Sequence, residues 1–238
     1  MLAAAAFFVV LASLVIGGRE TNDIALGRQR DTISHALTQH GLALARELRV
    51  QTVWTEAFEK TQAHDQAWTH AFYGVFLSKL FGYDDIYVLS SDNAPVYGFV
   101  DGHDVAPAEY AQVSAKIEDL IAALRNPGNA PNYNVVATDV SFGNGQSVEH
   151  LAVADIRRIL KSPATVVVST IVPDRATADA LDAPRYLLVA VENFDARLTK
   201  KLGAAFTFSN LQWITGKTPA GYSSLKLAGL DGRSVGTL

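Results

Sequence analysis

The sequence contains no cysteine, which excludes disulfide bonds, a thiolate nucleophile and cysteine-ligated metals. Its six histidines, at positions 35, 40, 64, 70, 103 and 150, show neither H-x3-H nor H-E-x-x-H spacing, so we expect no metal site and no cofactor. A G-x-S-x-G nucleophile elbow is also missing. The 20 basic and 24 acidic residues include no run of Lys and Arg, which gives no reason to expect a nucleic acid partner.

One long apolar segment is present at the start of the chain. It runs from Leu2 to Ile16 without a charge, and the sequence turns polar at residues 17–20. A transmembrane helix needs roughly 17–25 residues, whereas a signal peptide would carry a positive charge before the segment and small residues before a cleavage site. We therefore interpret residues 1–18 as a membrane anchor, which can be truncated at its start, with a cleaved signal peptide as the alternative. Both interpretations place the remaining chain outside the cytoplasm.

Residues 19–80 contain no proline and are predicted to be largely helical, with Thr21 or Asn22 as the capping residue. Apolar residues recur on one face, at Ile24, Ile33, Leu37, Leu44, Leu48 and Val53. This stripe fits a solvated helix with one packed face, or a stalk that continues the membrane helix and dimerises. We expect a homodimer through the N-terminal helices, because a long polar helix needs a partner to bury its stripe. The pattern breaks near His64, and a second helix with a core-facing aromatic stripe is predicted over residues 67–80.

Strand patterns begin after residue 80. Residues 86–89 and 95–99 are predicted to form a hairpin. A helix that opens at Pro107 and ends at Asn126 follows, and then a loop that includes Phe142-Gly-Asn-Gly145. Further strands are expected over residues 151–156, 165–172, 186–191, 205–213, 225–230 and 235–238, with a short helix from Asp195 to Gly203 and a turn at Asp231–Gly232. Consecutive strands with little helix between them imply an antiparallel sheet, so the predicted fold class is α+β.

Several short motifs resemble one family of bacterial sensor domains. They are Trp54-Thr-Glu-Ala-Phe58, Asp65-Gln-Ala-Trp68, Phe81-Gly-Tyr-Asp-Asp-Ile-Tyr-Val-Leu-Ser90 and the final hairpin Leu230-Asp-Gly-Arg-Ser-Val-Gly-Thr-Leu238. In these motifs the chain is similar to CHASE-type extracytoplasmic sensor domains of the fourth class. The family usually has Asp directly after the tryptophan, where this chain has Thr55.

The resemblance implies a PAS/Cache-like antiparallel sheet packed against a long N-terminal helix. Residues 81–238 would form this sensor domain, followed by a second membrane helix. The receptor would lie in the bacterial inner membrane, with the residues after about 18 on the periplasmic side. Such domains control cytoplasmic output domains, commonly the GGDEF and EAL domains that make and degrade cyclic di-GMP, and sometimes histidine kinases. The expected function is extracytoplasmic ligand sensing, with catalysis only in the output domains.

Six side chains are expected to contact the ligand, which is a small molecule or a periplasmic protein. They are aromatic or charged: Trp54, Phe58, Asp85, Tyr87, Tyr97 and Arg157. Small-molecule sites are mostly apolar and aromatic with a few polar groups, and an arginine can hold a carboxylate through two hydrogen bonds. By strand alternation, Asp155 shares a face with Arg157. We expect one cavity between the sheet and its helices, with core packing or a salt bridge as the alternative role of each residue.

Two other functions are left open by the residues. One is a membrane-anchored periplasmic hydrolase, which needs a convergent Ser/His/Asp or metal set that no spacing in this sequence signals. The other is a structural anchor domain that binds a protein partner and no small molecule.

Overall fold

The computed structural model describes residues 2–130, 133–160, 162–177, 185–205, 211–214, 217–219 and 224–238, with side chains from residue 27 onward. The helices are α1 Leu2–Thr52, α2 Thr55–Gln62, α3 Gln66–Thr69, the π-helix η1 His70–Phe76, α4 Leu77–Phe81, the 3₁₀ turn η2 Pro107–Tyr110, α5 Ala111–Arg125, the 3₁₀ turn η3 Pro127–Asn129 and α6 Ala196–Ala205. The strands are β1 Asp85–Leu89, β2 Pro95–Val100, β3 His103–Asp104, β4 Val136–Ser141, β5 Ser147–Ile159, β6 Ser162–Thr170, β7 Leu187–Asn193, β8 Lys226–Ala228 and β9 Ser234–Thr237.

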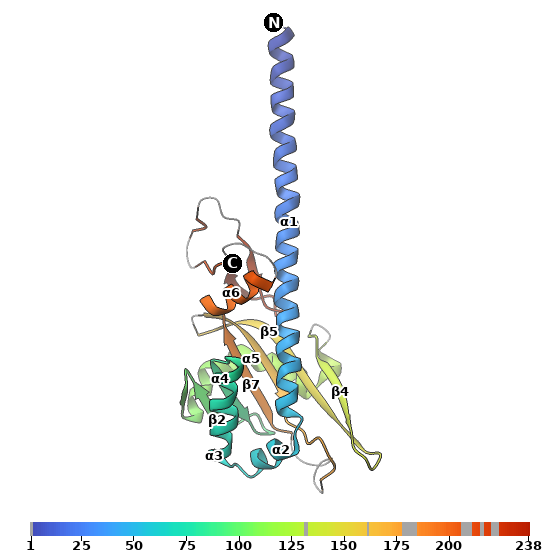
Figure 1. Ribbon diagram of the computed structural model, residues 1–238, viewed down its shortest axis with the longest axis vertical. Coiled ribbons are helices and arrows are strands. Elements are labelled where there is room, and N and C mark those ends of the chain that lie inside the picture. The colour runs from blue at the N-terminus through green and yellow to red at the C-terminus, as the bar shows by residue number, and fades with distance from the viewer. Residues whose placement is uncertain are drawn as a thin grey trace.

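Seven of the strands form one antiparallel sheet in the order β3-β2-β1-β7-β6-β5-β4, and β8 and β9 form a separate hairpin. The predicted α+β class with a long N-terminal helix is therefore confirmed (Figure 1). The register places Asp85 opposite Val191, Val191 opposite Val166, and Val166 opposite Asp155. Asp85 and Asp155 thus lie in one row across the sheet, on the same face.

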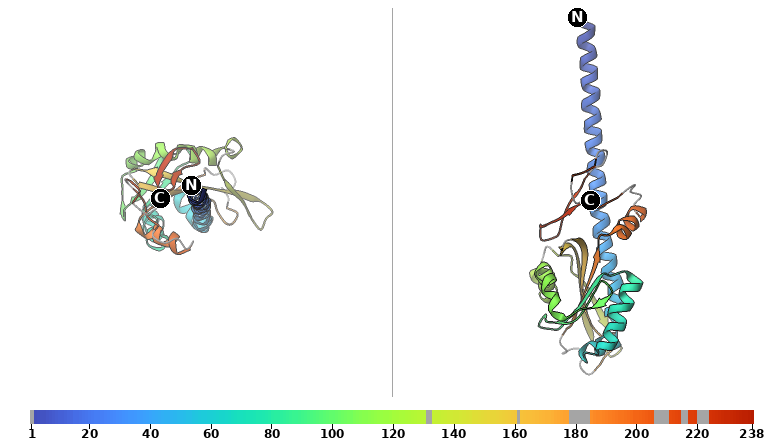
Figure 2. Two further views of the ribbon diagram at one scale, coloured as in Figure 1. Left: turned by 90° about the horizontal axis from the view of Figure 1, so that it is seen from above. Right: turned by 90° about the vertical axis from the view of Figure 1, so that its left-hand side faces the viewer.

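Helices cover both faces of the large sheet (Figure 2). We call the face under the lower half of α1, with α2 to α4, the α1 face; its core includes Leu48, Tyr73 and Val167. The opposite face packs against α5 and is called the α5 face, with Ile117 and Val189 in its core. Burial of these apolar side chains is the main stabilising contribution to the fold, roughly 1.5–3 kcal/mol for each large one.

The helix α1 is continuous from Leu2, which agrees with a stalk that continues the N-terminal segment, and Thr21 and Asn22 do not cap a separate start. It ends at Thr52, earlier than the predicted break near His64. Val53 leaves the helix because it bridges to Val172, a residue distant in sequence, and the Trp54 amide donates to the Val172 carbonyl at 3.0 Å.

The apolar stripe of α1 is covered by the domain itself. Leu37, Leu44 and Leu48 are all buried, packed against the sheet and the C-terminal hairpin. The α1 face of the sheet therefore supplies the partner that this stripe needs, and a homodimer through the N-terminal helices would use other residues of α1. Within the residues whose side chains are described, no helix combines the length and apolarity that a membrane crossing requires. The anchor expected over residues 1–18 lies outside that part of the chain.

Most of the other predicted elements are present with shifted ends. The hairpin is β1–β2, and the helix after Pro107 begins as a 3₁₀ turn and continues as α5 to Arg125. Two strands were missed. The two-residue strand β3 was not predicted, and β4 was missed because residues 136–141 were included in a loop. Gly203 lies inside α6 and does not end it. The strand expected over 205–213 falls largely on residues 206–210, which lie outside the described residues.

Candidate functional site

The sheet separates the six predicted ligand-contacting residues into two groups. Trp54, Phe58 and Tyr97 lie on the α1 face. Tyr87 is part of the core on the α5 face, Asp85 shares its face by strand alternation, and Arg157 pairs with a residue of α5. The six side chains therefore do not line a single cavity, and ligand contact by either group remains a prediction.

Trp54 belongs to an aromatic cluster near the surface. Its ring lies 5.7 Å from that of Trp68 and 5.1 Å from that of Phe72, between centroids. The aromatic stripe predicted over residues 67–80 consists of Trp68, Phe72, Phe76 and Leu80. Trp68 and Phe72 pack against the core as predicted, but Phe76 is 39% exposed and Leu80 is 63% exposed. The reason is the π-helix η1, whose i→i+5 hydrogen bonds shift residues spaced by four around the helix axis.

Thr55 and Tyr97 both make hydrogen bonds inside the domain. The Thr55 amide and hydroxyl donate to Asp174 Oδ1 at 3.0 and 2.5 Å, so a carboxylate from a distant segment lies beside the position where the family usually has Asp. The Tyr97 hydroxyl donates to Asp104 at 2.6 Å, and His70 Nδ1 lies 2.9 Å from the same carboxylate. Burial raises the pKa of Tyr97, and the charge of Asp104 raises it further.

Asp85 is a buried acid on the α5 face. Burial raises its pKa from 3.8 to about 7, and the charges of Asp101 and Asp84 add to this rise. No ion pair of Asp85 is found within the described residues. The neighbouring Tyr87 packs its ring 5.2 Å from that of Tyr110, at the start of α5. A carboxyl group that titrates near neutrality can either accept or donate a hydrogen bond, so Asp85 could serve a ligand in either role.

Arg157 holds a cluster of carboxylates where three segments meet. It is 3% exposed, and its guanidinium lies 2.8 Å from Asp119 of α5 and 2.9 Å from Asp155, with Asp231 of the hairpin turn also in contact. Although burial opposes the charge of the arginine, these acids raise its pKa. Burial raises the pKa of Asp155 to about 6 despite the arginine. The predicted shared face of Asp155 and Arg157 agrees with this contact.

The hairpin β8–β9 packs against both the sheet and α1. Its turn approaches β5 so closely that a side chain at Gly229 would come within 2.7 Å of the Ile156 carbonyl oxygen. The Asp155 carboxylate accepts from the Leu230 amide at 2.9 Å. On the other side, Leu227 and Val235 share an apolar cluster with Leu37 of α1. The Arg157 cluster therefore ties the hairpin to the sheet, and the apolar cluster ties it to α1.

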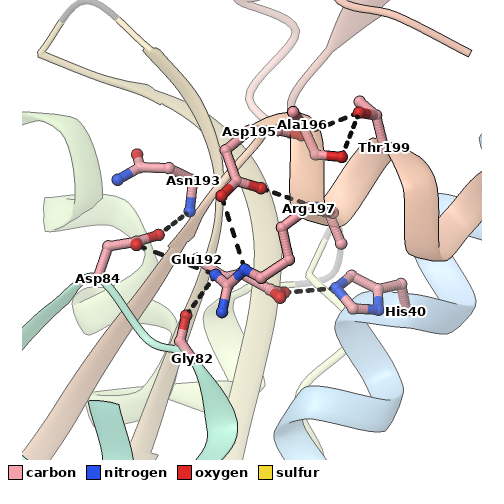
Figure 3. Close-up of polar contacts among 10 residues, drawn as sticks. His40, Gly82, Asp84, Glu192, Asn193, Asp195, Ala196, Arg197 and Thr199 are labelled. Carbon is pink, nitrogen blue, oxygen red and sulfur yellow. Dashed lines mark hydrogen bonds and ion pairs between the residues drawn. The ribbon is translucent and has the colours of Figure 1, made fainter. Parts of the chain in front are cut away.

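A second buried polar contact joins α1 to the sheet and was missed from the sequence. His40 Nε2 lies 2.6 Å from Glu192 Oε2 on β7, and both side chains are buried (Figure 3). Beside it, Arg197 of α6 donates to the Gly82 carbonyl, and Asp84 accepts from the Asn193 amide at 2.7 Å. The available signal was Glu192 at the end of the apolar run Leu187–Val191, since a carboxylate in a buried strand needs a partner.

A buried histidine also contacts hydroxyl groups under α1. His150 Nε2 lies 2.8 Å from Ser169 Oγ and 3.1 Å from Thr52 Oγ1, and all three residues are at most 2% exposed. Burial lowers the pKa of His150 to about 4, and the charge of Arg49 contributes. A nucleophile must be reached by its substrate and a catalytic histidine is oriented by an acid, so these buried contacts read as packing between α1 and β6.

Comparison with known proteins assigns the family. The family model of the CHASE4 domain matches residues 36–213, which is more than half of the chain. The match begins within α1 and includes the whole large sheet. A search of curated proteins gave no match. The chain therefore belongs to the CHASE4 family, whose members are extracytoplasmic sensor domains of membrane signalling proteins.

Proposed function

We propose that this chain is the extracytoplasmic ligand-sensing region of a transmembrane receptor that regulates cytoplasmic synthesis or degradation of cyclic di-GMP. Membership of the CHASE4 family supports sensing as the general role. The observation that carries the proposal is the packing of the C-terminal hairpin against α1 at one end of the sheet (Figure 1). A change in the packing between α1 and the hairpin would move these two segments relative to the sheet at the same time.

The mechanism requires two arrangements of α1 and the C-terminal hairpin. A ligand changes the output only through different affinities for the two arrangements. Strand β5 contacts α1, α5 and β9, so a ligand that shifts β5 from either face of the sheet acts on both segments. In this proposal residues 1–18 anchor the chain in the inner membrane, a second membrane helix follows residue 238, and the N-terminal helices pair in a homodimer.

The extracytoplasmic placement can be tested with single cysteines, because the chain has none of its own. In bacteria that express the full 238-residue chain, Gln112→Cys on the exposed side of α5 should react with a membrane-impermeant maleimide in intact cells. Leu120→Cys, which is buried under the same helix, should react only after denaturation. Labelling of Gln112→Cys only after cell lysis would contradict the proposed placement.

Regulation of cyclic di-GMP can be tested in the full receptor that contains this chain. Leu37→Ala removes a buried side chain at the contact between α1 and the hairpin, and should change the cellular cyclic di-GMP level while the protein remains present by immunoblot. Gln39→Ala, at an exposed position of α1, should leave that level unchanged. An unchanged cyclic di-GMP level together with altered autophosphorylation of the receptor would instead identify a histidine kinase as the output.

A further inference from the structure

A pocket of about 160 Å³ lies where α1, the sheet and the C-terminal hairpin meet. The segments that line it are distant in sequence, and they contribute Leu37, Thr38 and Gly41 from α1, Ile156 and Thr165 from the sheet, and Leu227 from the hairpin. The pocket is complete only when the hairpin packs on α1. An occupant would therefore favour that arrangement over one in which the two segments separate.

The wall that the sheet contributes holds a hydroxyl group without a partner. Thr165 is 1% exposed, and its Oγ1 makes no hydrogen bond within the part of the chain that is described. Its cross-strand neighbour Glu192 is already paired with His40 at 2.6 Å. Buried hydroxyl groups are normally hydrogen-bonded, because an unpaired one loses its contact with water without compensation. A molecule in the pocket can supply the missing partner.

The helix α1 passes over Thr165 at a glycine. Where the helix passes over the sheet it has Gly41, and an added Cβ there would lie 3.3 Å from Ala154 Cβ and 3.8 Å from Thr165 Cγ2. A longer side chain would project into the same space and close it. Glycine weakens the interior of a helix, so its position directly over Thr165 keeps the space open at a cost to α1.

We propose that this pocket binds a compact, uncharged molecule that carries a hydroxyl group. The hydroxyl exchanges a hydrogen bond with Thr165 Oγ1, and the rest of the molecule packs against Leu37, Ile156 and Leu227. Two charged residues, Asp155 and Lys226, also line the pocket. Asp155 is already paired with Arg157 at 2.9 Å and Lys226 is exposed, so the buried part around Thr165 offers no free counter-ion to a charged group. The volume suits a molecule with one small ring, since an engineered cavity of about 150 Å³ accepts benzene. This inference deepens the proposed function and rests on it only for the regulatory effect of binding.

The test uses two probes of nearly equal shape, para-fluorophenol and para-fluorotoluene, titrated into the full chain in mild detergent and followed by fluorine NMR. The phenol should bind saturably and more tightly than the toluene. Thr165→Val keeps the shape of the side chain and removes its hydroxyl, and should weaken phenol binding about two- to tenfold, the usual effect of one neutral hydrogen bond. Toluene binding should not change.

Matched variants separate this site from general effects. Thr61→Val in α2 also removes a buried hydroxyl without a partner in the described chain, and should leave phenol binding unchanged. Thr38→Leu, at an exposed position that lines the pocket, fills the space and should weaken both probes. The proposal is overturned if neither probe binds saturably in the millimolar range, or if the phenol binds wild type and Thr165→Val equally. Either result would leave the proposed sensor role intact. Labelling of Gln112→Cys only after cell lysis would instead overturn the extracytoplasmic sensor role and leave the proposal for the pocket intact.

Discussion

Replacement of Arg157 by methionine should destabilise the domain strongly. The guanidinium is 3% exposed and lies within 2.9 Å of both Asp119 and Asp155, with Asp231 as a third contact. Methionine keeps much of the apolar stem but removes the charge. Removal of one partner from a buried ion pair typically costs about 3–5 kcal/mol, because the remaining charge is buried without compensation. We expect a loss of this size in the free energy of unfolding near neutral pH.

The loss should depend on pH through Asp155. Its pKa is raised from 3.8 to about 6 by burial, even beside Arg157. A raised pKa in the folded state means that this state keeps a proton which the unfolded state has lost, so the contribution of Asp155 to stability falls as pH rises through this range. The displacement corresponds to about 3 kcal/mol. Without Arg157 the pKa rises further, so Arg157→Met should be least damaging at about pH 5 and most damaging at about pH 8.

Urea unfolding of the full chain, followed by tryptophan fluorescence at both pH values, measures this effect. Arg158→Met is the matched control, since this neighbouring arginine is exposed and donates a 3.3 Å hydrogen bond to the Val235 carbonyl, so its loss should change stability by no more than about 1 kcal/mol. Arg157→Met combined with Asp155→Asn should recover part of the loss at the higher pH. Equal losses at both pH values, with no recovery in the double variant, would refute the electrostatic reasoning. Loss of ligand binding without loss of stability would favour the ligand-contact role predicted from the sequence.

Three other changes test separate features of the domain. Asp85→Asn removes an acid whose pKa is raised to about 7, so wild-type stability should fall as pH rises from about 4 to 7 while the variant shows a flatter profile in thermal melts. His40→Leu leaves Glu192 buried without its partner and should lower the free energy of unfolding by about 3 kcal/mol or more, and adding Glu192→Gln should restore part of it; no recovery would contradict the pairing. In membranes, Gln39→Cys on the exposed side of α1 should cross-link to its own copy and Leu37→Cys should not, and failure of cross-linking at every exposed position of α1 would reject the homodimer.

The elements that depend on local signals could be predicted from the sequence. The β1–β2 hairpin is bounded by apolar strands and turns at Asn93, which has a positive φ of 65° that asparagine tolerates. The helix after Pro107 has its own start and stop residues. By contrast, the end of α1 at Thr52 depends on the bridge from Val53 to Val172. No local pattern contains that contact, so the sequence placed the break too late.

The faces of the sheet were harder to assign than the strands. Tyr97 lies opposite Val88 and not opposite Tyr87, and this register places the two tyrosines on different faces. The register shifts between Val88 and Leu89, next to the turn, and such an irregularity has no clear sequence signature. Alternation within one strand was sufficient to pair Asp155 with Arg157. The further partner Asp231 comes from the hairpin, and only the tertiary fold brings it there.

The polar contacts where α1 and the C-terminal hairpin pack on the sheet have the energy scale that signalling requires. Domains of this kind are stable by about 5–15 kcal/mol, and loss of one partner from a buried pair such as His40–Glu192 costs a substantial part of that. Coupling between two sites typically amounts to about 1–3 kcal/mol, which is close to the contribution of one hydrogen bond to a charged group. In the proposed mechanism, exchange of a single polar contact among α1, the hairpin and β5 would be sufficient to couple ligand binding to their arrangement. The apolar cores on the two faces of the sheet could stay unchanged while the contacts of α1 and the hairpin change.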